Sequence, residues 1–261
     1  IPVLSVMGIQ ACPMPTAVLT SQTGFKSFYC NDCTDKLDYY TSEWKKLGFQ
    51  PDGIYTGFLS SEKQDDKILD FINSFETENT LVLVDPVMGD GGRTYSLFTD
   101  ALACKMKKLV TVADVITPNL TECCILCDVD YCEFIKNADK PDFMDKIAEL
   151  GKNLLNRYGV KIVIITGIEH KDIDGTMYVQ NLIASKDEVF SVSCKKIGGS
   201  YSGTGDLFAS VMFSGLLRGD TLRDTVSLAV KFIETSLRDT VALGIDRNEG
   251  IEFEKHLKIL L

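Results

Sequence analysis

The sequence predicts an α/β fold in which helices cover both faces of a mainly parallel central sheet. Short apolar runs rich in β-branched residues alternate along the chain with longer amphipathic stretches. Such runs are typical of buried strands, and strand–helix alternation implies right-handed crossovers that leave successive strands parallel. The 261 residues contain no internal repeat, linker or shift in composition. We therefore expect one three-layer α/β/α domain over residues 1–261.

Four strands and four helices are predicted in the first part of the chain. The short apolar runs place buried strands at residues 53–56, 81–84, 115–116 and 161–165. The amphipathic stretches place helices at residues 35–47, 62–75, 99–110 and 143–158. Each helix can pack back onto the sheet before the next strand begins.

The pattern changes after the fourth strand. Residues 176–182 and 188–195 alternate in polarity on either side of residues 183–187, which predicts an antiparallel hairpin at a sheet edge. From Thr204 onward the apolar spacing becomes helical, and helices are expected at residues 204–217, 221–243 and 250–260.

The charge balance excludes some classes of partner. The chain has 27 Lys and Arg against 37 Asp and Glu, a net charge of −10. An acidic chain lacks the cationic surface that nucleic acids and anionic membranes require, so no nucleic-acid or membrane partner is expected. An anionic substrate must be held by local dipoles or a metal ion, because the overall field repels it.

Targeting signals and cysteines predict a compartment. No apolar run approaches the roughly 18–20 residues of a membrane span, and no signal peptide opens the sequence, so we expect a cytoplasmic protein. Nine cysteines, an odd number, fit free thiols in a reducing compartment. The pairs Cys30/Cys33 and Cys124/Cys127 are too far apart for a zinc ribbon, whose second pair follows after roughly 15–20 residues.

Polar residues follow each predicted strand at the edge where open α/β sheets bind ligands. They comprise residues 57–58, 85–92, 117–122 and 166–167. Three of these four segments carry groups that can bind a metal ion or phosphate. This coincidence is the first functional signal in the sequence.

A glycine-rich segment, GGSYSGTGD at residues 198–206, leads directly into an apolar helical stretch. Glycines ahead of a helix let backbone amides turn toward one point, and the helix dipole adds positive potential there. Gly203, Thr204, Gly205 and the helix start can therefore bind a phosphoryl group without a lysine. Asp206 can accept the proton of a substrate hydroxyl. The alternative is a surface turn in which Asp206 is merely an acid favoured in a first helical turn.

Two acidic segments are candidate magnesium ligands. Asp85 and Asp90 bracket a turn after the second strand, and Asn119 and Glu122 lie three residues apart after the third. Oxygen ligands of this kind suit Mg²⁺, which keeps several waters while it bridges nucleotide phosphates. Each segment has a structural alternative: Asp85 before proline can start a turn, and Asn119 with Glu122 can form a helix capping box.

Two further clusters are open to a functional or a structural interpretation. The polar residues 20–23 before Gly24 can orient a small polar substrate or satisfy turn amides. Tyr39, Tyr40 and Trp44 have the spacing of one helical face and are expected to pack in the core.

Taken together, five segments resemble the pyridoxal kinases of the ribokinase-like superfamily. In chain order they are PTAVL through TG at residues 15–24, TGF at 56–58, DPVMGD at 85–90, TPNLTE at 117–122 and GTGD at 203–206. The resemblance covers essentially the whole chain. It implies a ribokinase-like sandwich and ATP-dependent phosphorylation of the 5′-hydroxymethyl group of pyridoxal, pyridoxamine or pyridoxine.

The resemblance also implies roles for residues around the phosphates. Asp206 would be the catalytic base, with the backbone of Gly203, Thr204 and Gly205 as the anion hole. Metal and phosphate contacts are implied for Asp85, Asp90 and the Asn-x-x-Glu pair Asn119 and Glu122, with Mg²⁺ as the ion. Thr117 matches a monovalent-cation contact (K⁺), Thr166 and Thr204 match phosphate contacts, and Tyr95 matches a tyrosine near the nucleotide. On the substrate side, Thr23 matches the residue that contacts the pyridine substituents, with Phe58 nearby. A homodimer is also implied.

The chain departs from the family pattern at three places. Gln22 stands where a histidine is common, and Phe58 stands where a tyrosine is frequent. The family's opening strand and serine-containing loop precede Ile1, so we expect the chain to begin partway into the natural protein. The alternatives are a hydroxymethylpyrimidine or sugar kinase of the same superfamily, or a binding protein that keeps the fold without catalysis. Hydroxymethylpyrimidine kinases often have cysteine in place of Asp206, which favours the pyridoxal kinases.

Overall fold

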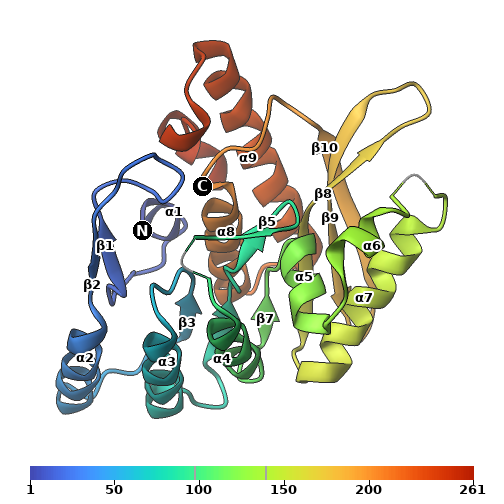
Figure 1. The fold of residues 1–261 in the computed structure, drawn as a ribbon. Coiled ribbons are helices and arrows are strands. Elements are labelled where there is room, and N and C mark those ends of the chain that lie inside the picture. Colours follow the sequence, from blue (N-terminus) through green and yellow to red (C-terminus); the bar gives the residue numbers. More distant parts are fainter. Residues whose placement is uncertain (97, 139) are drawn as a thin grey trace.

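A six-stranded mixed sheet forms the centre of the computed structural model, which describes residues 1–96, 98–138 and 140–261 (Figure 1). The strand order is β10-β9-β8-β7-β4-β3. The strands are β3 (Gly53–Thr56), β4 (Leu81–Val84), β7 (Val115–Ile116), β8 (Ile162–Lys171), β9 (Met177–Ser185) and β10 (Val189–Lys195). The strands β3, β4, β7 and β8 pair in parallel, whereas β8, β9 and β10 pair antiparallel. The predicted fold class and edge hairpin are confirmed.

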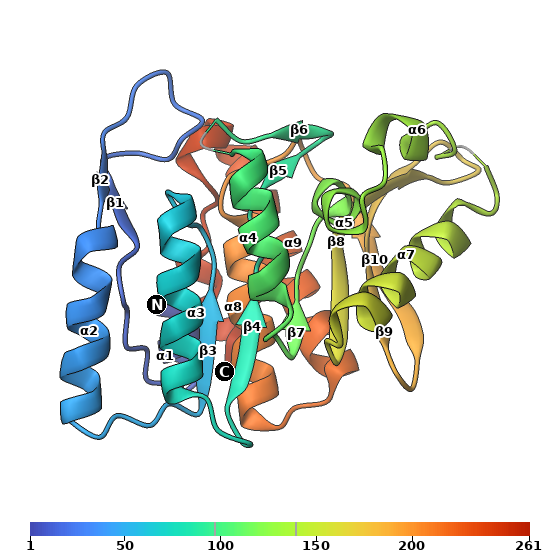
Figure 2. The same ribbon diagram turned by 60° about the horizontal axis from the view of Figure 1, so that its bottom comes forward.

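One face of the sheet is covered by the helices of the crossovers. They are α2 (Thr34–Lys46), α3 (Glu62–Phe75), α4 (Asp100–Val110), α5 (Leu120–Cys127) and α7 (Phe143–Tyr158), seen in front of the sheet in Figure 2. Val82, Val84 and Ile116 point into this layer with Ile72 and Leu154, all fully buried. The predicted aromatic packing is present for Tyr40 and Trp44, whose ring centroids lie 5.8 Å apart, and Trp44 lies 4.8 Å from Phe49. The prediction is wrong for Tyr39, which is 65% exposed, because adjacent residues of a helix do not share a face.

The other face is covered by N- and C-terminal helices. They are α1 (Pro2–Val6), α8 (Thr204–Arg218), α9 (Leu222–Leu243) and the 3-10 helix η2 (Glu254–Leu260). Leu83, Val115 and Ile164 point into this layer. Because neighbouring residues of β4 and β7 are buried on opposite faces, the strands read as continuous apolar runs, as expected of parallel strands covered on both sides. The helix α8 begins directly at the glycine-rich segment.

Several small elements lie outside the two main layers. They are the antiparallel pairs β1 (Ala17–Leu19) with β2 (Cys30–Asp32) and β5 (Gly89–Asp90) with β6 (Arg93–Thr94), the helix α6 (Tyr131–Ile135) and the 3-10 turn η1 (Arg247–Glu249). None was predicted, because segments of two to five residues carry too little periodicity to identify.

Three predicted boundaries need correction. The fourth strand continues to Lys171 through an irregularity between Ile165 and Ile168, where its partner β9 extends the ladder. The hairpin turn is shorter than predicted, because residues 183–185 belong to β9 and pair with β8 and β10. The last helix is a 3-10 helix over Glu254–Leu260 and not an α-helix from residue 250, since Gly250 has φ of +89° and breaks the helix.

The cysteines and long helices add two observations. All nine cysteines are free, and Cys123, Cys124 and Cys127 are buried in α5. Burial raises the pKa of the Cys124 thiol to about 12, so this CxxC pair is poorly suited to thiol chemistry. Within the described residues, no helix combines the length and apolarity needed to cross a bilayer.

Asp65 of α3 has a buried carboxyl group without a hydrogen-bond partner among the described residues. The side chain is 2% exposed. The pKa of Asp65 is raised to about 7, mainly by burial, with smaller contributions from the charges of Asp66 and Glu62. The folded state therefore binds this proton more tightly than the unfolded state, whose carboxyl has a pKa near 3.9.

Substitution Asp65→Asn is expected to remove a pH-dependent penalty. For a group with a raised pKa, stability falls as pH rises from about 4 to 7 and is lowest above pH 7. The variant should therefore gain about 2–4 kcal/mol of unfolding free energy over the parent at pH 8, and less at pH 5. Urea unfolding at the two pH values measures the difference.

Asp70→Asn is the matched control, because Asp70 is an exposed aspartate of the same helix α3. This control should change stability little at either pH. An advantage of Asp65→Asn that is equal at pH 5 and pH 8 would contradict the prediction.

Candidate functional site

Hydrogen bonds beyond the ends of the parallel strands bring three predicted loops together. The Asp85 amide donates to the carbonyl of Thr56 at 2.9 Å, and the Thr117 amide donates to Val84 at 3.3 Å. Farther along the sheet, Thr166 donates to Pro118 at 2.9 Å and forms a parallel bridge with Asn119. The segments at residues 85–92, 117–122 and 166–167 therefore meet at one edge, as predicted.

Asp85 and Thr117 form a buried pair at this edge. The Thr117 hydroxyl donates to Asp85 Oδ1 at 3.1 Å, and both side chains are buried. Burial raises the pKa of Asp85, the charge of Asp206 raises it further, and the Thr117 hydrogen bond opposes both. Asp206 thus lies close enough to Asp85 to act on it, although the two residues are far apart in sequence.

Asn119 and Glu122 form the capping box that was predicted as their structural alternative. The Asn119 side chain accepts from the Glu122 amide at 3.1 Å, and Glu122 Oε2 accepts from the Asn119 amide at 2.8 Å. The other oxygen, Oε1, accepts from the Met88 amide at 3.0 Å, and Asn119 Nδ2 donates to the Gly89 carbonyl at 2.7 Å. The pair therefore joins the start of α5 to the turn after β4. Burial, followed by the charge of Asp85, raises the pKa of Glu122.

Asp90 is the last residue of β5, and Tyr95 directly follows β6. Asp90 is exposed, and its Oδ1 accepts from the Gly91 amide at 2.8 Å. Tyr95 is 41% exposed, and its amide donates to Met88 at 3.0 Å. Burial raises the pKa of Tyr95, and Glu122 and Asp90 are the next contributors. The negative charges of Glu122 and Asp90 therefore act on the Tyr95 hydroxyl.

The glycine-rich loop leaves the start of α8 open. Gly203 is the N-cap with φ of +83° and no side-chain cap, and Thr204 turns its hydroxyl to the Tyr201 carbonyl at 3.1 Å. A Cβ built on Gly203 or Gly205 would meet no atom within 4 Å. The start of α8 thus has no side-chain cap and adjoins open space at Gly203 and Gly205, and the free amides of a helix start suit an anion.

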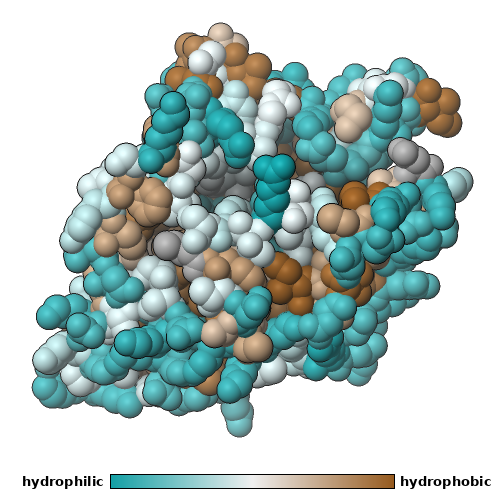
Figure 3. All heavy atoms as spheres, in the orientation of Figure 1, coloured by the Kyte–Doolittle hydropathy of each residue, from teal (hydrophilic) through white to brown (hydrophobic). Residues whose placement is uncertain are grey.

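Asp206 occupies the first turn of α8 beside that space. Its side chain is exposed to solvent, yet protein atoms crowd the carboxyl, and this desolvation raises the pKa of Asp206. Figure 3 shows the molecule from this side, where the surface is hollowed between the C-terminal helices and the β5–β6 pair. An exposed acid in the first turn of a helix can reach a substrate hydroxyl.

Tyr55 was not identified from the sequence as a site residue. It lies on β3 and packs on Phe213 of α8, with ring centroids 5.8 Å apart. Burial raises the pKa of Tyr55, with further contributions from Asp85 and Asp206. Its place one residue before the end of a predicted strand is the signal that could have identified it.

The predicted substrate residues lie on separate segments. Thr23 is half-buried in the loop between β1 and β2, and Phe58 is half-buried after β3, where its carbonyl accepts from the Thr16 hydroxyl at 3.0 Å. Among the described residues, no hydrogen bond joins either of them to Asp206.

The donor set fits a magnesium ion held mainly by phosphates and water. Within residues 1–96, 98–138 and 140–261, no group of three or more His, Cys, Asp or Glu side chains is arranged to hold a metal ion alone. Mg²⁺ is usually held by one or two carboxylates together with substrate phosphates and water. Asp85 and Glu122, two buried acids of which Asp85 raises the pKa of Glu122, fit such an arrangement.

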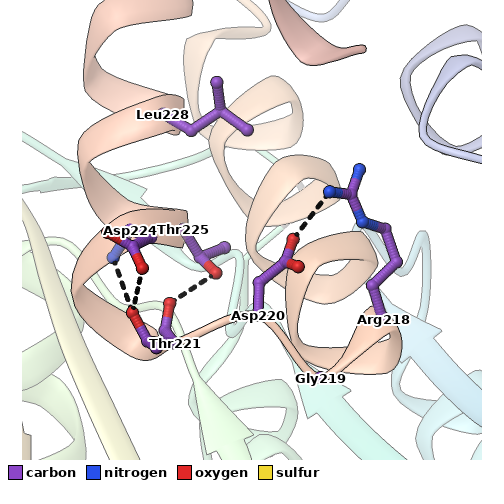
Figure 4. Close-up of a pocket in the computed structure, with 7 residues that line it drawn as sticks. All are labelled: Arg218, Gly219, Asp220, Thr221, Asp224, Thr225 and Leu228. Carbon is purple, nitrogen blue, oxygen red and sulfur yellow. Dashed lines mark hydrogen bonds and ion pairs between the residues drawn. The ribbon is translucent and has the colours of Figure 1, made fainter.

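Two described cavities lie elsewhere. One, of about 530 Å³, is at the turn between α8 and α9, where Arg218 pairs with Asp220 (Figure 4). The other, of about 820 Å³, lies near Gly159 and Lys161, just before the start of β8. Neither cavity is lined by a predicted site residue. The candidate site is an open hollow at the carboxyl edge of the sheet.

The chain resembles proteins of known family. The profile of the phosphomethylpyrimidine kinase family matches residues 4–250. A candidate pyridoxal kinase of Schizosaccharomyces pombe is 29% identical over 207 residues, which cover 77% of this chain and 57% of the relative. A hydroxymethylpyrimidine/phosphomethylpyrimidine kinase of Staphylococcus aureus is 27% identical over 198 residues, covering 76% of this chain and 66% of the relative. The chain thus spans less than two thirds of either relative.

Solved structures match over nearly the whole chain. A candidate phosphomethylpyrimidine kinase of Bacteroides thetaiotaomicron, crystallised with pyridoxal, is 38% identical with a TM-score of 0.90, covering 99% of this chain and 88% of its own. The pyridoxal kinase of Lactobacillus plantarum is 24% identical with a TM-score of 0.85, covering 100% and 89%. The second likeness confirms the predicted ribokinase-like fold.

Substitution Glu122→Gln is expected to destabilise the protein. A glutamine amide has only one oxygen, so its NH₂ group must face the amide of either Met88 or Asn119. Leaving a buried donor unpaired costs about 1–3 kcal/mol. Chemical unfolding measures the loss.

Glu133→Gln is the matched control, because Glu133 holds the same third position of α6 with an exposed side chain. Equal effects of the two substitutions would show that the two Glu122 contacts contribute nothing.

Proposed function

This chain belongs to the phosphomethylpyrimidine kinase family, and we propose that it transfers the γ-phosphoryl group of ATP to the 5′-hydroxymethyl group of a B6 vitamer. The observation that carries the proposal is the start of α8, which is flanked by glycines and has no side-chain cap. Asp206 lies in its first turn, and the charge of Asp206 raises the pKa of Asp85. The pyridoxal complex of the 38% identical relative supports a B6 vitamer as the acceptor.

Asp206 acts as the base in the proposed reaction. The alcohol oxygen attacks the γ-phosphorus, a new P–O bond forms, and the bond to the β–γ bridging oxygen breaks so that ADP leaves. The alcohol proton passes to the Asp206 carboxylate. Desolvation raises the pKa of Asp206, which brings its basicity closer to the operating pH, where general-base catalysis is most effective.

The start of α8 stabilises the charge on the transferring group. The backbone of Gly203, Thr204 and Gly205 starts α8 without a side-chain cap and beside open space, so the amide dipoles are in place before the reaction begins. Preorganised donors of this kind are a large source of transition-state stabilisation in phosphoryl transfer. A Cβ at Gly205 would project into this space.

The nucleotide lies at the acidic edge of the sheet in this proposal. Asp85 and Glu122 would hold Mg²⁺, with Asp90 as a neighbouring acid, and the ion would supply positive charge against the nucleotide phosphates. Both Glu122 oxygens already accept backbone amides, so this residue acts through its remaining lone pairs or through water.

The remaining proposed contacts are assigned by position. Asn119 shapes the nucleotide site, because its amide is already engaged in the capping box and with Gly89. Thr166 and Thr204 face phosphate oxygens, Thr117 contacts a monovalent cation such as K⁺, and Tyr95 lies beside the nucleotide. Thr23 and Phe58 contact the pyridine ring.

A second acceptor is supported by the family description. Both that description and the name of the Staphylococcus aureus relative point to a pyrimidine alcohol. The aspartate at residue 206, which differs from the cysteine expected of hydroxymethylpyrimidine kinases, favours the B6 vitamers. A sugar kinase or a binding protein without catalysis is a further outcome of the tests below. The homodimer and the cytoplasmic location also belong to the proposal.

The acceptor is tested by turnover of alcohols with ATP and Mg²⁺. We expect phosphorylation of pyridoxal, pyridoxamine or pyridoxine, measured as ADP release and phosphorylated product, at higher kcat/KM than for hydroxymethylpyrimidine or ribose. A preference for either of the last two alcohols would overturn the proposed acceptor. Binding without any turnover would identify a binding protein.

Substitution Asp206→Asn tests the base. Asparagine keeps the shape but cannot accept the proton, so kcat should fall by about 10²–10⁴-fold, while the Kd for pyridoxal changes little. Asp220→Asn is the control, because Asp220 follows the opposite end of α8 and pairs with Arg218. Unchanged kcat in Asp206→Asn would exclude this residue as the base.

A further inference from the structure

The turn η1 contacts two loops that are distant in sequence. Asn248 Oδ1 accepts a hydrogen bond from Gln22 Nε2 at 2.9 Å, which reaches the loop between β1 and β2. The neighbouring Arg247 carbonyl accepts from the Ser202 amide at 3.0 Å, which reaches the glycine-rich loop. In Figures 1 and 2 the loop beyond β1 and β2 extends to the C-terminal segment. One short turn therefore supports both the loop between β1 and β2, residues 20–29, which we call the substrate loop, and the glycine-rich loop of the anion hole.

The orientation of the Gln22 amide is determined by the backbone. The Gly24 amide donates to Gln22 Oε1 at 2.7 Å, so the oxygen must face Gly24 and the NH₂ group must face Asn248. Both ends of the Gln22 amide are thus engaged within the protein. Asn248 is itself held, because its amide donates to Asp246 Oδ1 at 2.8 Å.

Gly24 gives an independent indication that this contact is closely fitted. A Cβ at Gly24 would lie 2.7 Å from Asn248 Oδ1 and 2.7 Å from Gln22 Nε2. Real Cβ atoms do not approach other atoms so closely, so only glycine permits this arrangement without a shift.

The substrate loop, residues 20–29, has one hydrogen-bonded attachment to the rest of the protein among the described residues. Its other hydrogen bonds are internal, such as Thr20 amide to Tyr29 carbonyl at 3.0 Å and Ser21 hydroxyl to Ser27 carbonyl at 3.3 Å. The attachment is the bond from Gln22 to Asn248. Thr23 lies next to this attachment, between Gln22 and Gly24.

We propose that Asn248 is a positioning residue that holds the substrate loop in its binding position through Gln22, and so sets the affinity for the alcohol substrate. The inference rests on the proposed function, in which Thr23 contacts that substrate. Without the bond, the loop must be ordered when substrate binds, and this ordering reduces affinity. The nucleotide contacts at Asp85, Glu122 and Thr166 belong to other loops, so nucleotide affinity stays unchanged.

The kinetic test compares Asn248→Ala, Gln22→Met and the double variant. Each single variant should raise KM for pyridoxal about fivefold, the equivalent of one ordinary hydrogen bond. The double variant should show no more than the single effect, because both substitutions remove the same bond. KM for MgATP should stay within about twofold. Glu249→Ala is the control, because Glu249 is an exposed residue of the same turn. Additive effects, or equal increases in both KM values, would overturn the proposal.

Limited proteolysis tests the same bond without catalysis. Lys26 is exposed within the substrate loop, so trypsin can cleave after it. Asn248→Ala and Gly24→Ala should each accelerate cleavage at Lys26 several-fold over the parent and Glu249→Ala, with thermal unfolding showing that all variants are folded. Equal cleavage rates would refute the attachment. If the parent phosphorylates no B6 vitamer, the proposed function fails, and this measurement still decides whether Asn248 holds the loop.

Discussion

The buried carboxylate of Glu122 accepts one hydrogen bond from a backbone amide in the turn after β4 and another from a backbone amide at the start of α5. Parallel strands bring these loops to the same edge, but strand pairing ends before them and leaves their amides without partners. A carboxylate has acceptor capacity for both donors, so one side chain joins the two loops. Asp85, Tyr95 and the β5–β6 pair are positioned by segments that depend on this junction.

Concentrated negative charge is the second constraint on the site. Asp85, Glu122 and Asp206 all have raised pKa values because burial or crowding disfavours their charged forms. Binding of a cation or a proton therefore stabilises such a carboxyl group more than it stabilises an acid on the surface. The open amides at the start of α8 provide the opposite polarity nearby. This arrangement suits a reaction in which a metal-bound anion and a proton move together.

Structural and functional interpretations of one motif need not exclude each other. Asn119 and Glu122 form a complete capping box, which would account for the spacing by itself. The charge of Asp85 also raises the pKa of Glu122, and Asn119 forms a parallel bridge with Thr166 beyond the strand ends. The turn η1 likewise has two contacts, because Asn248 binds the substrate loop and Arg247 binds the glycine-rich loop.

The sequence by itself determined the layers and the edge where the site lies, because apolar periodicity specifies buried strands and helices, and parallel strands end together. It also identified the glycine-rich start of α8, since backbone freedom there depends on residue type alone. Only the tertiary structure decided that Tyr55 and Asp85 lie near Asp206, and that Gln22 contacts Asn248. Those pairs join residues far apart in sequence, and their contact depends on packing, which no local pattern records.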